Sequence, residues 1–130
     1  MNKRVRITSD EYLHKDFHGA ISLGFIHLRE CYGKDLLKEY WERLGRTCYR
    51  DLVEDIKERG LEALADHWKR IFTAEDGKFS LRYDGDVLVL EVHECPALSH
   101  MRSKGYVVDV GFCEHTEVVN SAICREAGHL

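Results

Sequence analysis

Apolar residues recur every three to four positions through the first half of the chain, which is the spacing of amphipathic helices. The first such stretch runs from Ser9, a residue type suited to an N-cap, to Gly33, which suits a C-terminal cap. Further helical stretches cover residues 34–59, with a kink or break expected at Gly45, and residues 61–72. We expect one face of the first helix to be buried, made by Leu13, Phe17, Ala20, Ile21, Gly24, Leu28 and Cys31.

The apolar period changes to two after residue 78, which predicts a β-hairpin. Its arms are residues 79–83 and 87–92, and the sequence Asp-Gly-Asp between them supplies the turn. The second arm is apolar on both faces, so we expect it to be sandwiched between the helices and another layer. A helix from Pro96 to Gly105, a third strand over residues 106–110 and a last helix over about residues 114–127 complete the prediction.

These elements predict a single α+β domain over residues 1–130, in which residues 1–8 form a flexible or edge segment. N-terminal helices would pack on a small antiparallel sheet, with a short Cys-Pro helix and a C-terminal helix beside it. The chain has 130 residues, of which 44% are hydrophobic and 32% charged, which is the balance of a globular protein.

The charge pattern argues against nucleic acid and membranes as partners. The net charge is -4, and the basic cluster at residues 2–6 is too small for a nucleic-acid interface. The start does not resemble a secretory signal, and no apolar run approaches the roughly 20 residues that a membrane span needs. We therefore expect a cytoplasmic protein whose five cysteines are thiols, ligands or catalytic groups, with a homo-oligomer left open.

Two cysteines lie at predicted helix starts and are the main site candidates. Cys95 precedes Pro96, and Cys113 opens the last helix. Unpaired N–H groups and the helix dipole at such positions favour an anion and can lower the pKa of a thiol from about 8.5. The ordinary interpretation is that each is a small buried apolar residue. We expect the two thiols to converge on one site, although they are distant along the chain.

Histidines supply the other candidates. His115 shares a helix face with apolar residues and is predicted to point inward, as a general base, a metal ligand or an ordinary core residue. His93, at the end of the hairpin, carries the same alternatives. His14 and His18 are spaced i and i+4, as a metal pair would be, although half-buried surface histidines also fit.

A three-ligand metal site could form from Cys95, Cys113 and His115, with water or His18 as the fourth ligand. The spacing of these residues is not that of a zinc finger or zinc ribbon, which disfavours structural zinc. The remaining cysteines, Cys31, Cys48 and Cys124, are predicted to be structural.

The segments "VLEVHECPALSHMRSKGY" and "GFCEHTEVVNSAICREAG" resemble the L-2-amino-thiazoline-4-carboxylic acid hydrolase family. The likeness is strongest over residues 79–128, and "GKDLLKEYWERLG" and "HWKRIF" upstream are similar in style. The resemblance implies hydrolysis of the cyclic amidine in a thiazoline, opening the ring to an N-carbamoyl-cysteine-type product. It also allows for a divalent metal such as zinc or manganese. The positions that carry over are Cys95, Cys113 and Asn120.

The sequence thus favours a small-molecule hydrolase acting on a non-peptide C–N bond. Cys95 would be the nucleophile or a ligand, Cys113 a second thiol and His115 the base or a ligand, with His18, His93 and Asn120 binding substrate. The alternative is a non-enzymatic ligand-, metal- or redox-sensing module that uses Cys95 and Cys113.

Overall fold

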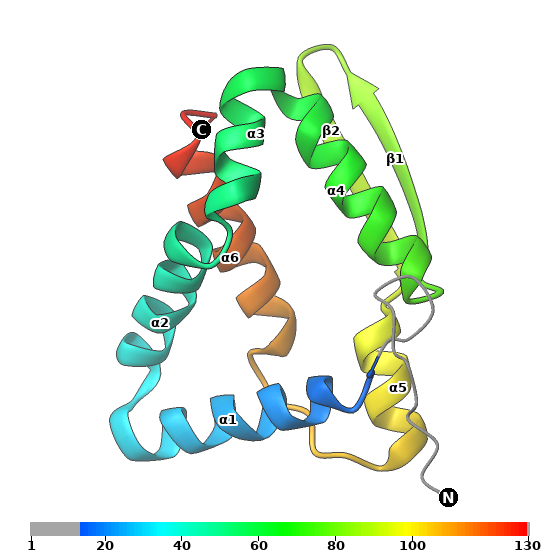
Figure 1. Cartoon of the computed structure of the whole chain (residues 1–130). Coiled ribbons are helices and arrows are strands. Elements are labelled where there is room, and N and C mark those ends of the chain that lie inside the picture. The colour runs from blue at the N-terminus through cyan, green and yellow to red at the C-terminus, as the bar shows by residue number, and fades with distance from the viewer. Residues whose placement is uncertain (1–13, 130) are drawn as a thin grey trace, which may run out of the picture.

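The computed structural model describes residues 14–129, and these form an α+β arrangement of six helices and one two-stranded antiparallel sheet (Figure 1). The elements in chain order are α1 (Phe17–Tyr32), α2 (Lys34–Thr47), α3 (Arg50–Arg59), α4 (Leu61–Ala74), β1 (Lys78–Asp84), β2 (Val87–Glu94), α5 (Pro96–Lys104) and α6 (Phe112–Glu126). The α+β class predicted from the sequence is therefore confirmed. No helix in this part of the chain is both long enough and apolar enough to cross a membrane.

The helices form a frame around the centre of the molecule (Figure 1). Helix α1 meets α2 at one end and α5 at the other, α2 packs along α6, and α4 connects α3 to the hairpin through β1. The core lies where these elements meet, and its fully buried large side chains include Leu37, Trp41, Ile56, Met101 and Ile123. Trp41 of α2 packs edge-on against Phe25 of α1, with ring centroids 5.4 Å apart. This contact joins the first two helices.

Two mid-helix glycines give a matched prediction for stability. A Cβ on Gly45 would lie 2.7 Å from both Ala122 Cβ and the carbonyl oxygen of Val119, whereas nothing lies within 4 Å of a Cβ on Gly24. Gly45→Ala should therefore lower the free energy of unfolding by about 1–3 kcal/mol through overpacking of α2 on α6. Gly24→Ala should raise it by about 0.5–1 kcal/mol, because alanine is the better helix former. Urea unfolding of both variants measures the difference, and equal effects would contradict the tight α2–α6 crossing.

The predicted buried face of α1 is correct only for Ile21 and Leu28, which are partly buried and pack against the core. Phe17 is 44% exposed, and Ala20, Gly24 and Cys31 are also exposed. The buried residues are His18, Ser22 and Phe25 instead. Ser22 and His18 are polar, and each binds a buried partner on another segment, so hydrophobic periodicity could not reveal this face. The predicted helix start at Ser9 and the position of Leu13 lie outside the described residues.

The break within residues 34–59 falls at Cys48 and Tyr49, between α2 and α3, and not at Gly45. Gly45 stays helical because its missing side chain is what allows α6 to approach α2. The hairpin, the two-residue turn at Gly85 and Asp86, and the helix that begins at Pro96 are confirmed.

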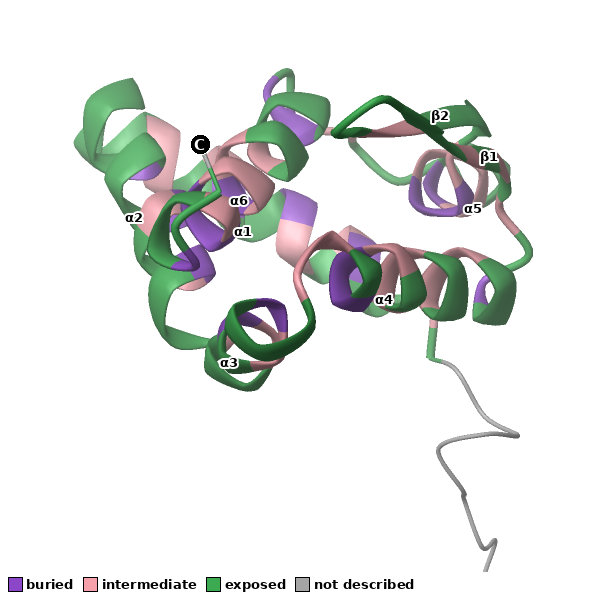
Figure 2. Ribbon diagram, turned by 90° about the horizontal axis from the view of Figure 1, so that it is seen from above, coloured by how far each residue is buried: buried purple, intermediate pink, exposed green. Residues whose placement is uncertain are grey.

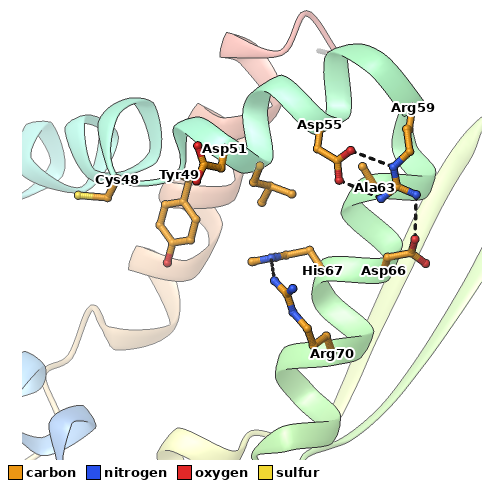
Figure 3. Close-up of a pocket in the computed structure, with 10 residues that line it drawn as sticks. Cys48, Tyr49, Asp51, Asp55, Arg59, Ala63, Asp66, His67 and Arg70 are labelled. Atoms are coloured by element: carbon orange, nitrogen blue, oxygen red, sulfur yellow. Dashed lines mark hydrogen bonds and ion pairs between the residues drawn. The ribbon is translucent and has the colours of Figure 1, made fainter. Parts of the chain in front are cut away.

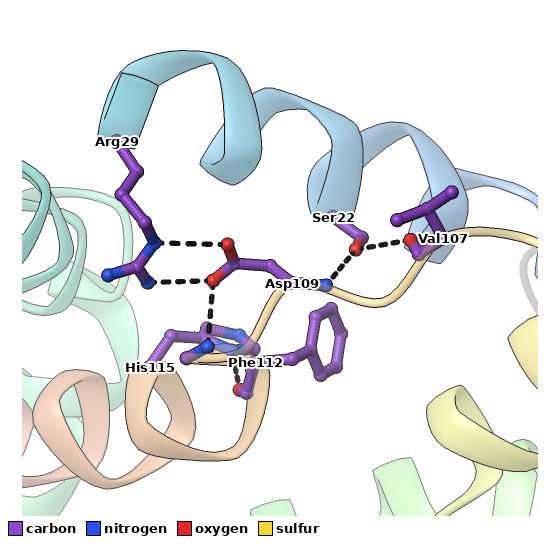
Figure 4. Close-up of polar contacts among 7 residues, drawn as sticks. Ser22, Arg29, Val107, Asp109, Phe112 and His115 are labelled. Atoms are coloured by element: carbon purple, nitrogen blue, oxygen red, sulfur yellow. Dashed lines mark hydrogen bonds and ion pairs between the residues drawn. The ribbon is translucent and has the colours of Figure 1, made fainter. Parts of the chain in front are cut away.

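The third strand predicted over residues 106–110 is absent, because this segment pairs with neither of the two strands in residues 14–129 and is fixed to α1 by side chains (Figure 4). Ser22 Oγ donates a hydrogen bond to the carbonyl oxygen of Val107 and accepts one from the backbone N–H of Asp109, both at 2.8 Å. The second arm of the hairpin is not sandwiched either, since Val87 is 61% and Val92 43% exposed. Figure 2 shows the sheet with one face open.

Candidate functional site

A cavity of about 560 Å³ lies among α1, α2, α4, β2 and α6. Its lining is largely aliphatic and aromatic, and among residues 14–129 it includes no aspartate, glutamate, lysine or arginine. The lining residues are Ile21, Phe25, Tyr40, Leu44, Cys48, Tyr49, His67, Trp68, Ile71, Phe72, Leu90, Val92, His115, Thr116, Val119, Asn120 and Ile123. A mainly apolar pocket of this size with a few polar groups is typical of small-molecule sites.

The His115 side chain lines this cavity in a fixed tautomer. Its Nδ1–H donates a hydrogen bond to the carbonyl oxygen of Phe112, so the lone pair of the neutral ring is on Nε2. Nε2 has no partner among the described residues and, unlike the indole N–H of Trp41, is not sealed from solvent. The ring packs against Phe25 and Phe112, with centroids 4.9 Å and 4.7 Å away. Phe25, Phe112 and the helix together hold the ring in place.

Burial lowers the pKa of His115, and the hydrogen bond to Phe112 opposes this only in part. The positive charge of a protonated His18 also lowers the pKa, while the charge of Asp109 raises it. His115 is therefore neutral at pH 7 and can accept a proton or a hydrogen bond at Nε2.

Close to His115, the charged side chains of Arg29 and Asp109 pair with each other (Figure 4). Arg29 donates to both carboxylate oxygens of Asp109, at 3.2 Å and 2.9 Å, and the backbone N–H of Gly111 donates to Oδ2 at 2.9 Å. Burial alone would raise the pKa of Asp109, but these hydrogen bonds and the Arg29 charge outweigh it, so the pKa is lowered. The network fixes the start of α6, and with it the position of His115.

Asn120 lies one helical turn beyond Thr116 on the cavity wall. Its Oδ1 accepts a hydrogen bond from the indole N–H of Trp68 at 3.2 Å, and its Nδ2 donates to the carbonyl oxygen of Thr116 at 2.8 Å. These bonds link α4 to α6 across the wall and hold the Trp68 ring against the cavity.

His67 and Tyr49 separate the cavity from a second, polar cleft of about 430 Å³ between α3 and α4 (Figure 3). Arg70 donates to Nδ1 of His67 at 3.4 Å, so Nε2 of His67 carries the proton. Burial lowers the pKa of His67 and raises that of Tyr49. Both side chains are therefore neutral at pH 7 and can donate hydrogen bonds.

The charges of the polar cleft are largely paired with one another (Figure 3). Arg59 donates to both oxygens of Asp55 at 2.9 Å and to Asp66 at 3.0 Å, on the open surface of the molecule. Because exposed pairs of this kind are screened by solvent, the cleft offers no strong field for an ionic ligand.

No protein-family model, curated protein or solved structure matches this chain. These comparisons therefore give no support to the resemblance of residues 79–128 to the thiazoline hydrolases.

The structure does not bring Cys95, Cys113 and His115 together. Cys113 and His115 are two positions apart on α6, about 200° around a helix, so the thiol is exposed while the imidazole points inward. Cys95 caps α5 as predicted and packs against the hydrophobic core, whereas Cys113 is the second residue of α6 and is exposed. Neither thiol lines the cavity.

The predicted metal site therefore does not form. Among residues 14–129, no group of three or more histidine, cysteine, aspartate or glutamate side chains is arranged to hold a metal ion. The proposed zinc or manganese does not fit these residues, because Cys113 and His115 face opposite sides of α6.

The remaining predicted histidines lie away from the cavity. His18 is buried, and its Nε2 lies 2.5 Å from Glu75 Oε1 at the end of α4. His14 precedes α1 and is exposed, so the two histidines do not both lie on that helix as predicted. His93 is exposed on the hairpin, with Nε2 3.3 Å from Ser80 Oγ. Of the predicted site residues, only His115 and Asn120 line the cavity.

The sequence reasoning missed Cys48, Tyr49, His67 and Trp68 as lining residues. The sequence predicts Cys48 to be structural, but its side chain is exposed and lines the cavity. The sequence feature that could have indicated them is His67 beside Trp68 on an amphipathic helix. Without the fold, this pattern does not distinguish a cavity wall from a core.

The half-buried His115 and His67 predict a stability that rises with pH. The pKa of His115 and that of His67 are lowered in the folded protein, while the pKa of a histidine in the unfolded chain is about 6.5. At a pH between the folded and the unfolded values, the unfolded chain therefore binds more protons than the folded protein does. Their contribution is complete above about pH 6.5 and is lost as the pH falls through the folded values. Urea unfolding at several pH values from 5 to 7.5 should show this slope, and His115→Gln should reduce it. An unchanged slope in the variant would contradict the burial of His115.

Proposed function

We propose that the protein is a small-molecule hydrolase that opens a cyclic amidine or a related non-peptide C–N bond in the central cavity. The observation that carries this proposal is the neutral His115, which lines the cavity and whose Nε2 has no hydrogen-bond partner among the described residues. Those of the described residues that line the cavity include no aspartate, glutamate, lysine or arginine. The reaction class is supported only by the resemblance of residues 79–128 to the thiazoline hydrolases.

The proposed chemistry is general-base attack by water. His115 Nε2 removes a proton from water while the oxygen bonds to the ring carbon, and the electrons of the carbon–heteroatom double bond move to the heteroatom. The tetrahedral intermediate then collapses and the single bond from that carbon to the leaving ring atom breaks. This atom is nitrogen in a cyclic amide, and sulfur in a thiazoline that gives an N-carbamoyl-cysteine-type product. The imidazolium returns its proton to the leaving atom, so the net change is the addition of one water. The Phe112 carbonyl keeps His115 in the required tautomer throughout.

Water is the preferred nucleophile because no suitably placed thiol faces the cavity from a helix start. Cys95 and Cys113 do not line it. Cys48 does, but it lies at the C-terminal end of α2, where carbonyl oxygens and not N–H groups would face a developing anion. A thiolate at Cys48 would therefore lack the stabilisation by helix N-terminal N–H groups that the sequence predicts for Cys95 and Cys113.

The second candidate function is a ligand-sensing module that binds the same class of molecule without turnover. It is favoured by Asn120, whose amide is engaged at both ends by groups of the cavity wall and so contributes no free group to a reaction. The Cys95–Cys113 redox pair receives no support, because both are free thiols on separate parts of the molecule.

A turnover assay separates the two candidates. The probe is 5-benzylhydantoin, a neutral ring with an aromatic substituent, and N-carbamoyl-phenylalanine is followed by liquid chromatography and mass spectrometry. We expect product formation that falls when Thr116, an exposed residue of the cavity lining, is replaced by tryptophan to block the entrance. Glu117→Trp, also exposed but outside the lining, is the matched control and should keep the wild-type rate. Binding of the hydantoin without product would assign the sensing function instead.

A further inference from the structure

We propose that the cavity selects an uncharged, planar aromatic or heteroaromatic ligand that bears an N–H group, and that it excludes carboxylates. This inference rests on the proposed function only in taking the central cavity as the ligand site. It adds the class of substrate, which is a neutral molecule here and would be a carboxylic acid if taken from the family resemblance.

The composition of the walls is the first argument. Aromatic rings contribute much of the lining, from Phe25, Tyr40, Tyr49, Trp68 and Phe72. Such rings stack or pack edge-on against flat ligands, and they give nothing to stabilise a full charge of the ligand. Moving an unpaired carboxylate from water into this lining would leave it desolvated, which is strongly unfavourable.

The charged residues behind the walls do not change this conclusion. Arg29 and Asp109 neutralise each other and lie outside the lining. Arg70 lies on the other side of His67, in the polar cleft, and donates to the His67 ring. A carboxylate in the cavity would therefore find no cation that is free to pair with it among the lining residues.

The hydrogen-bonding groups define the ligand further. Nε2 of His115 is an acceptor, so the ligand group that meets it must donate a hydrogen, as an amide or a neutral amidine does. A carboxylate oxygen there would face a lone pair and be repelled. The protonated Nε2 of His67 and the hydroxyl of Tyr49 can donate to a carbonyl oxygen of the same ligand. A carboxamide or lactam satisfies both kinds of group.

This ligand class departs from that of the family that the sequence resembles. The substrate in that family's name carries a carboxylate, which needs a cationic partner, and the cavity lining provides none. The acid 2-amino-thiazoline-4-carboxylate should therefore be turned over poorly, even if the reaction type is retained.

The test compares two probes of the same shape, cinnamamide and cinnamate, by isothermal titration calorimetry with the full chain at pH 7.5. We expect cinnamamide to bind at least about tenfold more tightly than cinnamate, because only the acid brings an uncompensated charge. Binding in the cavity is confirmed if the indole N–H signal of Trp68 shifts in an NMR spectrum of the ¹⁵N-labelled protein. Equal or tighter binding of cinnamate, or no binding of cinnamamide, would overturn the proposal.

Two variants test the reason for the preference. Thr116→Arg adds a cation at an exposed position of the lining and should strengthen cinnamate binding, narrowing or reversing the preference. Arg70→Gln should leave the preference unchanged, and loss of cinnamate binding in this variant would show that Arg70 holds carboxylates and that the proposal is wrong. If cinnamate binds well and the hydantoin is still hydrolysed, the substrate class fails while the hydrolase function stands. If cinnamamide binds and the hydantoin is not hydrolysed, the hydrolase function fails while the ligand class stands.

Discussion

Replacing His115 with glutamine should reduce the turnover of 5-benzylhydantoin by about 10²–10⁴-fold, the usual contribution of a general base. The amide of glutamine can occupy part of the same space but cannot remove a proton from water at neutral pH. The rate constant kcat should fall more than KM rises, because the apolar and aromatic walls that bind the substrate remain. Single-turnover and steady-state assays of the purified variant measure both constants.

The pH profile gives a second readout that a merely structural role of His115 would not produce. Because burial lowers the pKa of His115, wild-type kcat/KM should reach its plateau below the pH expected of an ordinary histidine and fall only in more acidic solution. The residual activity of His115→Gln should lose this acidic limb. His93→Gln is the matched control, since His93 lies on the exposed hairpin, and it should keep the wild-type rate. If His115→Gln keeps full activity while remaining folded, His115 is not the base.

The parts of the fold that the sequence predicted correctly depend on local rules. Pro96 at a helix start, Gly105 at its end and Gly85 in the hairpin turn each have a backbone geometry that few other residues adopt so readily, and Gly85 and Gly105 have φ of 60° and 71°. The third strand failed because residues 106–110 have the composition of a strand but no neighbouring strand, and only the fold reveals that Ser22 ties them to α1.

In the candidate site, too, local sequence patterns predicted some residues, and contacts between distant segments could not be predicted. His115 could be found because it shares a helix face with core residues such as Val119 and Ile123, whereas Asn120 was predicted only through the family resemblance. The pairing of Cys113 with His115 was wrong because positions i and i+2 do not share a helix face, which sequence spacing alone already implies.

The cavity itself was not predictable from the chain. Its walls come from five elements that are distant in sequence, and their apolar residues have the same pattern whether they fill a core or line a void.

Replacing Asp109 with asparagine should lower the free energy of unfolding by about 2–4 kcal/mol, measured by urea unfolding at pH 7. The side chain of Asp109 is almost fully buried and accepts hydrogen bonds from Arg29 on both oxygens and from the Gly111 N–H. In asparagine one of these oxygens becomes an NH₂ group, so a donor would face a donor, and Arg29 would lose its counter-charge. Asp86→Asn, at the exposed hairpin turn, is the matched control and should change stability by less than about 0.5 kcal/mol.

The effect of Asp109→Asn should also depend on pH, with a sign that follows from the pKa of Asp109. That pKa is lowered in the folded protein, so the stabilisation by the carboxylate is complete above the unfolded value of about 4 and is lost as the pH falls through the folded value. The difference between wild type and variant should therefore shrink in acid. Because the same network fixes the start of α6, the variant should also shift the NMR signals of the His115 ring. A stable variant with unshifted His115 signals would show that α6 is positioned by its packing on α2 and not by the Arg29–Asp109 pair.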